Sequence, residues 1–208
     1  MKRSGSIALF GENGFSILEL MVVVGIIGVI SAIAVPMMKN TVGNFRLSGD
    51  ARGLANAVSL AKLRAASNFS QARLYVDLSA QSFHVQTWNK TLAAWVTEGG
   101  TTTLSSNDTF SFGVVGTAPP LSQGTIGQVS KCVTEAGAEI GGTACILFNS
   151  RGIPVDPAGA PPAVGAPTGN DAMYITDGTA VFGVTLQATG LIKMWRTNPA
   201  VTPSWMLQ

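Results

Sequence analysis

Apolar residues are most concentrated near the start of the chain. From Phe15 to about Val35 nearly every side chain is apolar, and Glu19 is the only ionisable residue between Phe15 and Lys39. A helix of about 20 apolar residues is long enough to cross the hydrocarbon core of a bilayer. The pattern therefore predicts a membrane-spanning helix over residues 15–38, with one carboxylate inside its apolar stretch.

The next segment, residues 39–70, has the pattern of an amphipathic helix. Apolar residues recur there at spacings of three and four, the period of one helix face; they are Leu47, Ala51, Leu54, Val58, Ala61 and Ala65. Most charged residues of the segment lie off that face. We expect the anchor helix to continue as a spine whose apolar stripe packs on a sheet.

The remaining residues, 71–208, alternate between strand-like runs and turns. The runs are short, apolar or β-branched, and bounded by turn-forming residues; they are Ala72–Leu78, Ser82–Trp88, Ala94–Thr97, Phe110–Val115, Ala144–Asn149, Ala172–Ile175, Val181–Leu186 and Gly190–Arg196. A turn is expected over Asp77–Gln81. The predicted fold class is α+β, with a long N-terminal helix packed on an antiparallel β-sheet domain.

Composition agrees with this division. Only 12% of the residues are charged, and the formal net charge of +2 includes Lys2 and Arg3 near the N-terminus. This charge gives no indication of a nucleic-acid partner. The segment 156–170 is rich in Pro, Gly and Ala without periodicity, which predicts a flexible exposed loop.

A cleaved secretory signal is the main alternative for the N-terminus, because Lys2 and Arg3 precede an apolar run. The run is longer than the roughly 7 to 15 residues of a signal-peptide apolar region. It also contains Glu19, and Ser31–Ala34 is only a weak cleavage site. These features favour a retained anchor.

Gly14, Phe15 and Glu19, followed by LMVVVGIIGVISAIAVP, resemble the class III leader and first helix of type IV pilins and type II secretion pseudopilins. The resemblance implies a pilin-like fold, a leader over residues 1–14, cleavage between Gly14 and Phe15 by prepilin peptidase, and N-methylation of Phe15. It also implies that Gly28 and Pro36 mark a helix bend, and Pro36 lacks the amide for one helical hydrogen bond.

The resemblance further implies a location and partners. The chain would cross the bacterial inner membrane once, hold its soluble domain in the periplasm, and join a pseudopilus or surface pilus. Its partners would be prepilin peptidase, other pilins or pseudopilins through the N-terminal helix, the inner-membrane assembly platform and membrane lipid. In such a bundle Glu19 would pair with the new amine of a neighbour's Phe15, because pairing offsets the cost of a charge in low dielectric. A carboxylate that only snorkels to the lipid headgroups is the alternative.

Two later segments, Ile146–Pro154 and Gly183–Trp195, resemble the paired late-strand motifs of the minor pseudopilin H and FimT-like branch. Relatives that take up DNA carry a basic Gly-Arg-x-Arg pattern in the last strand, where this chain keeps only Lys193 and Arg196. Two cations support DNA contact weakly, because phosphate binding draws on many cationic side chains. We expect a structural minor subunit of a type II secretion pseudopilus, with a minor type IV pilin acting in pilus assembly or DNA uptake as the alternative.

Cys132 and Cys145 are the only cysteines. The resemblance places them outside the cytoplasm, where disulfides persist. We therefore expect a structural disulfide, with two free buried thiols as the alternative. Their spacing fits neither a CxxC redox motif nor a zinc site.

The sequence contains no recognisable catalytic constellation. His84 is the sole histidine, and no nucleophile elbow, Walker loop or HExxH pair is present. Asp171 and Asp177 fit turn chemistry, and two carboxylates are too few to indicate a calcium site. We expect no enzymatic activity, metal or cofactor. The hypothesis of a different class is a membrane-anchored enzyme or binding protein with a pocket around His84 or the Asp residues.

Overall fold

The computed structural model describes residues 15–208 and divides into two units, one ending at Val42 and the other spanning Gly43–Gln208. One helix, α1 (Ile17–Ser67), contributes to both units. Ser16 caps its first turn, because the Leu18 amide donates a hydrogen bond to Ser16 Oγ at 3.3 Å. The predicted leader, residues 1–14, lies outside the described residues.

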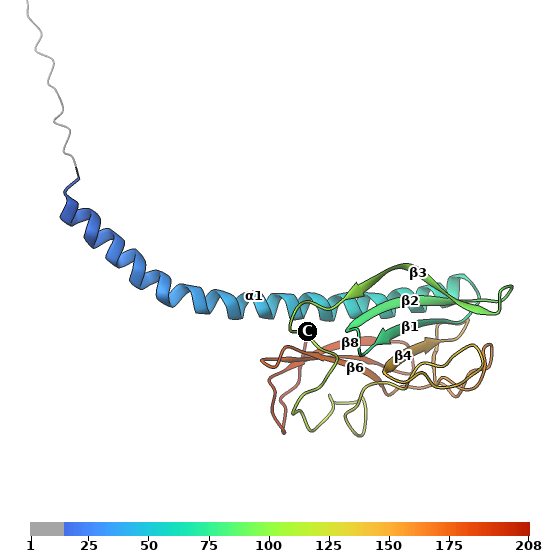
Figure 1. The fold of residues 1–208 in the computed structure, drawn as a ribbon. Helices are drawn as coiled ribbons and strands as arrows, with labels where there is room; N and C mark the ends of the chain where they lie inside the picture. The colour runs from blue at the N-terminus through green and yellow to red at the C-terminus, as the bar shows by residue number, and fades with distance from the viewer. Residues whose placement is uncertain (1–14) are drawn as a thin grey trace, which may run out of the picture. The chain divides into compact units, whose positions relative to one another are not determined.

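The larger unit contains two antiparallel sheets. The first has five strands in the order β3-β2-β1-β4-β5 and the second has four in the order β6-β7-β8-β9. The first sheet comprises β1 (Ala72–Asp77), β2 (Ser82–Asn89), β3 (Ala94–Thr103), β4 (Thr143–Phe148) and β5 (Pro154–Val155). The second comprises β6 (Asp171–Thr176), β7 (Val181–Leu186), β8 (Ile192–Thr197) and β9 (Met206–Leu207). The predicted α+β class is therefore confirmed (Figure 1).

The spine stripe predicted from periodicity forms the centre of the core. All six of its residues, from Leu47 to Ala65, are 0% exposed. They share one apolar cluster with Leu74 of β1, Ile146 of β4 and Met173 of β6. The helix is therefore covered by both sheets, and burial of this face, at about 25 cal/mol per Å² of apolar area, holds the larger unit together.

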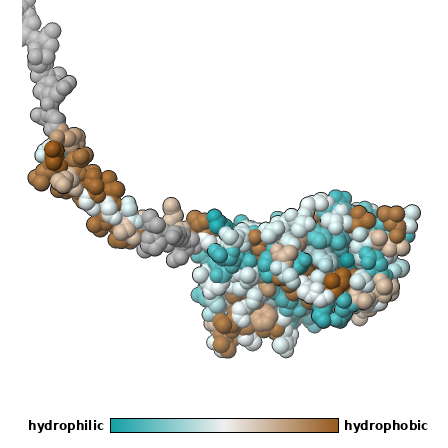
Figure 2. Space-filling view, viewed as in Figure 1, coloured by the Kyte–Doolittle hydropathy of each residue, from teal (hydrophilic) through white to brown (hydrophobic). Residues whose placement is uncertain are grey.

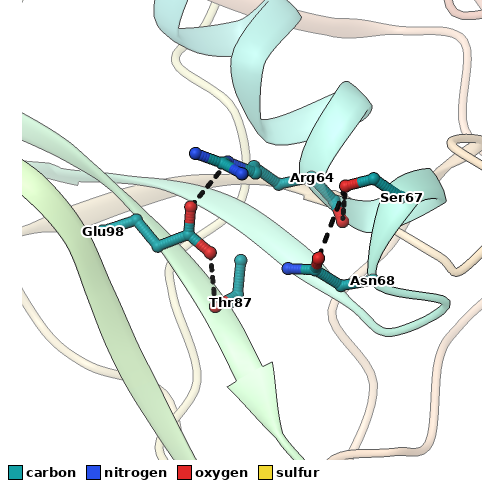
Figure 3. A network of polar contacts seen from close by, with 5 residues as sticks. All are labelled: Arg64, Ser67, Asn68, Thr87 and Glu98. Atoms are coloured by element: carbon teal, nitrogen blue, oxygen red, sulfur yellow. Dashed lines mark hydrogen bonds and ion pairs between the residues drawn. The ribbon is translucent and has the colours of Figure 1, made fainter.

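A left-handed residue ends α1, and polar contacts hold its last turn against the first sheet. Phe69 adopts a left-handed conformation, with φ of 47°, and the Ser70 amide donates to the Ala65 carbonyl at 3.2 Å, as in a Schellman-type helix end. Arg64 forms an ion pair of 2.6 Å with Glu98 of β3, whose other carboxylate oxygen accepts a hydrogen bond from Thr87 of β2 (Figure 3). The network joins the last turn of the helix to the β2–β3 hairpin.

Lys62 makes a second link, from α1 to the other sheet. Its Nζ donates to the carbonyl of Gly190, in the turn before β8, at 2.9 Å. Gly190 has φ of 75°, and a Cβ there would lie 2.7 Å from that same Nζ. The left-handed conformation therefore favours glycine here, and a Cβ would displace the end of the Lys62 side chain and its hydrogen bond.

Most predicted strands appear within two residues of their expected bounds, but several differ. Residues 94–97 are the start of a longer strand, β3, and Phe110–Val115 is not a strand. That segment turns at Gly113, with φ of 57°. Phe110 packs in the main core against Phe83, whereas Phe112 and Val115 pack in a smaller cluster with Tyr174. The two-residue strands β5 and β9 were not expected, since they are too short to show an alternating pattern.

Hydrogen bonds explain the conformation of two loops, the turn after β1 and residues 156–170. The predicted turn after β1 is confirmed, because Asp77 Oδ1 accepts hydrogen bonds of 2.8 Å from the amides of Ser79 and Ala80. Within residues 156–170, Asp156 pairs with Ala166 and Gly165 through backbone hydrogen bonds. The segment therefore folds back on itself beside β5.

Candidate functional site

The unit ending at Val42 carries the most unusual surface among the described residues. Ile17–Ala34 is apolar enough to span a membrane, with a mean hydropathy of 2.6, and none of it is buried. Figure 2 shows hydrophobic side chains gathered along this part of α1. Apolar surface of this extent is stable against lipid or against other helices and is unfavourable in water.

Glu19 lies in the first turn of this exposed segment. A carboxylate there interacts favourably with the positive end of the helix dipole. The Glu19 side chain is exposed, and among residues 15–208 no group forms a hydrogen bond or ion pair with it. A charge-pairing partner for Glu19 would therefore have to come from outside the described chain.

The other residues suggested by the pilin resemblance also lie in this unit, except Gly14, which lies outside the described residues. Phe15 lies two residues before the start of the helix at Ile17 and is 79% exposed. The helix continues without interruption through Gly28 and Pro36, and a Cβ at Gly28 would meet nothing within 4 Å. Cleavage, N-methylation and the helix bend stay predictions.

Cys132 and Cys145 form the predicted disulfide. Cys145 belongs to β4, and Cys132 lies in the loop that precedes this strand, so the bond fixes the loop against the first sheet. Both residues are almost completely buried. The Cys132 amide also donates to Thr143 Oγ1 at 3.1 Å, which adds a second link between the same segments.

The sheet places His84 closer to a cysteine than the sequence indicates. Tyr75 of β1 is in register with His84 on one side and Cys145 on the other, and its ring stacks on His84 at 5.0 Å. Burial, followed by the charge of Arg73, lowers the pKa of His84 against the opposing effect of Asp77. Because Cys145 is disulfide-bonded, this group holds no thiolate nucleophile.

The two aspartates that flank β6 have different environments. Burial raises the pKa of Asp171 to about 7, and nearby Asp156 adds to the shift. Burial also acts to raise the pKa of Asp177, but hydrogen bonds from Thr179 and Ala180 outweigh it and lower the pKa. In the part of the chain from residue 15 onward, no group of three His, Cys, Asp or Glu residues is arranged to hold a metal ion.

The two basic residues considered for DNA contact both lie on β8, but on opposite faces. Lys193 pairs with Thr185 of β7, and Arg196 pairs with Phe182, over whose ring its guanidinium lies at 5.9 Å. Side chains three positions apart on a strand point to opposite sides of the sheet. The structure therefore does not bring Lys193 and Arg196 together into one basic surface.

Comparison with known proteins finds a similar solved structure. No protein-family model matches the chain, and no curated protein matches it. A solved structure, the minor pseudopilin EpsH from the Type 2 Secretion System of Vibrio cholerae, is similar over 78% of this chain and 96% of EpsH. The sequence identity is 10% and the TM-score is 0.36.

Sequence reasoning missed one residue of this site, Ser16. Its hydroxyl accepts the Leu18 amide, and its carbonyl accepts the Leu20 amide at 3.1 Å. The signal was present, since Ser16 and Glu19 have the Ser-x-x-Glu spacing of a capping box. Ser16 therefore fixes where the helix begins and places Glu19 in its first turn.

Proposed function

We propose that this chain is a structural minor subunit of a type II secretion pseudopilus, anchored in the inner membrane and assembled through its N-terminal helix. The observation that carries the proposal is the fully exposed apolar segment Ile17–Ala34, with Glu19 in its first turn. Such a helix is suited first to lipid and then to a bundle of similar helices, because both environments remove its apolar surface from water.

The proposed processing step is cleavage by prepilin peptidase between Gly14 and Phe15, followed by N-methylation of Phe15. The leader motif supports this step, and so does the start of the helix at Ile17, which leaves Phe15 outside the helical hydrogen-bond ladder. Cleavage would create a cationic amine at Phe15. In a staggered bundle this amine would pair with Glu19 of a neighbouring subunit, so that one ion pair offsets the cost of two charges in low dielectric.

The soluble domain would then lie in the periplasm, where the disulfide Cys132–Cys145 is stable. The inner-membrane assembly platform would extract the subunit into the fibre, and the domain would present its surface to neighbouring subunits. We propose a structural role without catalysis, because the His84 group and the aspartates at β6 are accounted for by packing and turn chemistry.

The decisive experiment is deletion of this chain alone, with complementation by the wild type. Loss of secreted exoproteins with normal sheared surface pili is the expected result. Loss of pili with normal secretion would instead make the chain a minor type IV pilin, for which DNA uptake would be measured next. Normal secretion and normal pili would overturn both fibre assignments. So would a mature protein that still begins at Met1 in cells containing the peptidase, which would favour a membrane-anchored enzyme or binding protein.

A further inference from the structure

An open pocket of about 240 Å³ lies beyond the C-terminal end of α1 in the larger unit. Segments far apart in sequence form it: residues 69–71 after the helix, the end of β2, residues 149–150 after β4, and part of the 156–170 loop. Its volume is below the roughly 300 to 1,000 Å³ typical of small-molecule sites. The pocket is therefore suited to one side chain of a larger partner.

Apolar side chains contribute much of the pocket wall, and Phe69 is the most unusual of them. It is 74% exposed and has a φ of 47°, a conformation that favours glycine at a helix end. An aromatic residue at this position is strained, and its ring gains little from burial within this chain. Trp88, Pro162 and Val164 supply further apolar wall.

Two side chains of the pocket can donate hydrogen bonds to a negatively charged group. Lys90 Nζ donates to the Phe69 carbonyl at 2.7 Å, and no carboxylate among residues 15–208 forms an ion pair with it. The side-chain oxygen of Asn149 accepts from the amides of Arg151 and Ile153, which leaves its NH₂ group as a donor. An ammonium without a carboxylate partner and a free side-chain NH₂ that line the same pocket favour a carboxylate ligand.

Gln71 adds an acceptor at the pocket. Its side chain is only 6% exposed and donates to the Pro162 carbonyl at 2.6 Å, while its Oε1 is buried without a hydrogen-bond donor among the described residues. An unsatisfied buried acceptor carries a free-energy cost. The hydrogen bond from Gln71 to residue 162 therefore ties the 156–170 loop to the rest of the pocket wall.

We propose that this pocket binds the C-terminal residue of a partner polypeptide. The apolar side chain of that residue packs against Phe69 and Val164, and its free carboxylate binds Lys90 and the Asn149 amide. The small volume requires the apolar group and the carboxylate to belong to one residue, which favours a chain terminus over an internal Asp or Glu. This inference does not depend on which fibre the chain joins.

The test uses the purified full-length protein in detergent micelles and a fluorescent hexapeptide ending in leucine. We expect saturable binding of the free-acid peptide and at least tenfold weaker binding of the same peptide with an amidated C-terminus. Lys90→Gln should weaken free-acid binding to a similar degree. Lys131→Gln is the matched control, because Lys131 is an exposed lysine outside the pocket, and binding should be unchanged.

A second variant separates binding from folding. Phe69→Gly suits the left-handed backbone, so the thermal midpoint should stay the same or rise while peptide binding weakens. Equal binding of the acid and amide peptides would overturn the proposal. So would the absence of binding by the wild type at millimolar peptide, or unchanged binding by Lys90→Gln.

Discussion

At the scale of single residues, Glu19 is the ionisable side chain of the exposed apolar segment of α1, and no group among residues 15–208 forms an ion pair with it. A carboxylate at the centre of a membrane helix costs about 2.5 to 3.5 kcal/mol on insertion scales. Glu19 lies instead in the first turn, where the helix dipole favours a negative charge. Under the proposed function, this position would allow insertion into the bilayer and leave the charge available to a neighbouring subunit.

Glu19→Ala and Glu19→Gln should both leave membrane insertion and leader cleavage intact and reduce incorporation into the fibre. The reason is loss of the intermolecular ion pair, which both substitutions remove. The measurement is the fraction of processed protein recovered in the sheared or extracted fibre. Ser31→Ala is the control, since it lies in the same exposed segment and leaves Glu19 unchanged. Unchanged incorporation of both Glu19 variants would refute the pairing mechanism.

A second prediction at this scale concerns pH. Burial, with the nearby carboxylates Asp50 and Asp177, raises the pKa of Asp108 to about 7 from 3.8, against the opposing effect of Arg46. The pKa of Asp171 is raised to a similar value, mainly by burial. The folded protein thus binds protons that the unfolded chain releases, so the contribution of these groups to stability is fully present below about pH 4 and is lost as the pH rises to about 7.

These two carboxyl groups should therefore make the urea unfolding midpoint higher at pH 5 than at pH 8. Asp108→Asn and Asp171→Asn should each reduce the difference, because asparagine resembles the neutral acid and does not titrate. A difference that is the same in wild type and in the double variant would show that other groups set the pH dependence.

At the scale of elements, the apolar stripe of the spine lies at the centre of the core of the larger unit. Leu54 is 0% exposed in the centre of this stripe, while Leu63 on the same helix is 65% exposed. Leu54→Ala should lower the free energy of unfolding by about 2 to 5 kcal/mol through lost burial and a residual cavity. Leu63→Ala should change it by no more than about 0.5 kcal/mol. Urea unfolding of both variants measures the contrast, and equal effects would contradict the packing described.

The disulfide predicted from the sequence also links two segments of the fold. Cys132 and Cys145 are separated by 13 positions. Closing a loop of this length stabilises a fold by about 3 kcal/mol in the chain-entropy model. The double variant Cys132→Ala with Cys145→Ala should therefore unfold at lower urea than the oxidised wild type. Reduction of the wild type should lower its urea midpoint by a similar amount. An unchanged midpoint after both thiols have been released would show that the disulfide does not stabilise the fold.

Prediction at the element scale succeeded where the pattern was local. The strands over residues 72–77 and 181–186 were found because consecutive side chains are apolar, β-branched or aromatic between clear turn signals. The segment Phe110–Val115 has a similar composition but forms a loop, from which Phe110 packs in the main core and Phe112 and Val115 pack near Tyr174. Local apolar content does not distinguish these two outcomes.

At the scale of the whole molecule, the two units have opposite surface chemistry. The unit ending at Val42 exposes its apolar side chains, whereas Gly43–Gln208 buries its own in a core shared by the spine and both sheets. One helix thus exposes an apolar surface in one unit and supplies part of the core in the other. This division is what the proposed fibre function requires of a single chain.

The sequence by itself determined the apolar N-terminal helix, the buried face of the spine and most strands, because each depends on a pattern within a few consecutive turns or residues. Only the tertiary structure decided that Lys193 and Arg196 lie on opposite faces of β8, that Asp108 lies beside Asp50 and Asp177, and that a pocket forms beyond α1. These features depend on contacts between segments far apart in the chain. Such contacts are set by how the sheets pack on the helix, and no local pattern of residues encodes them.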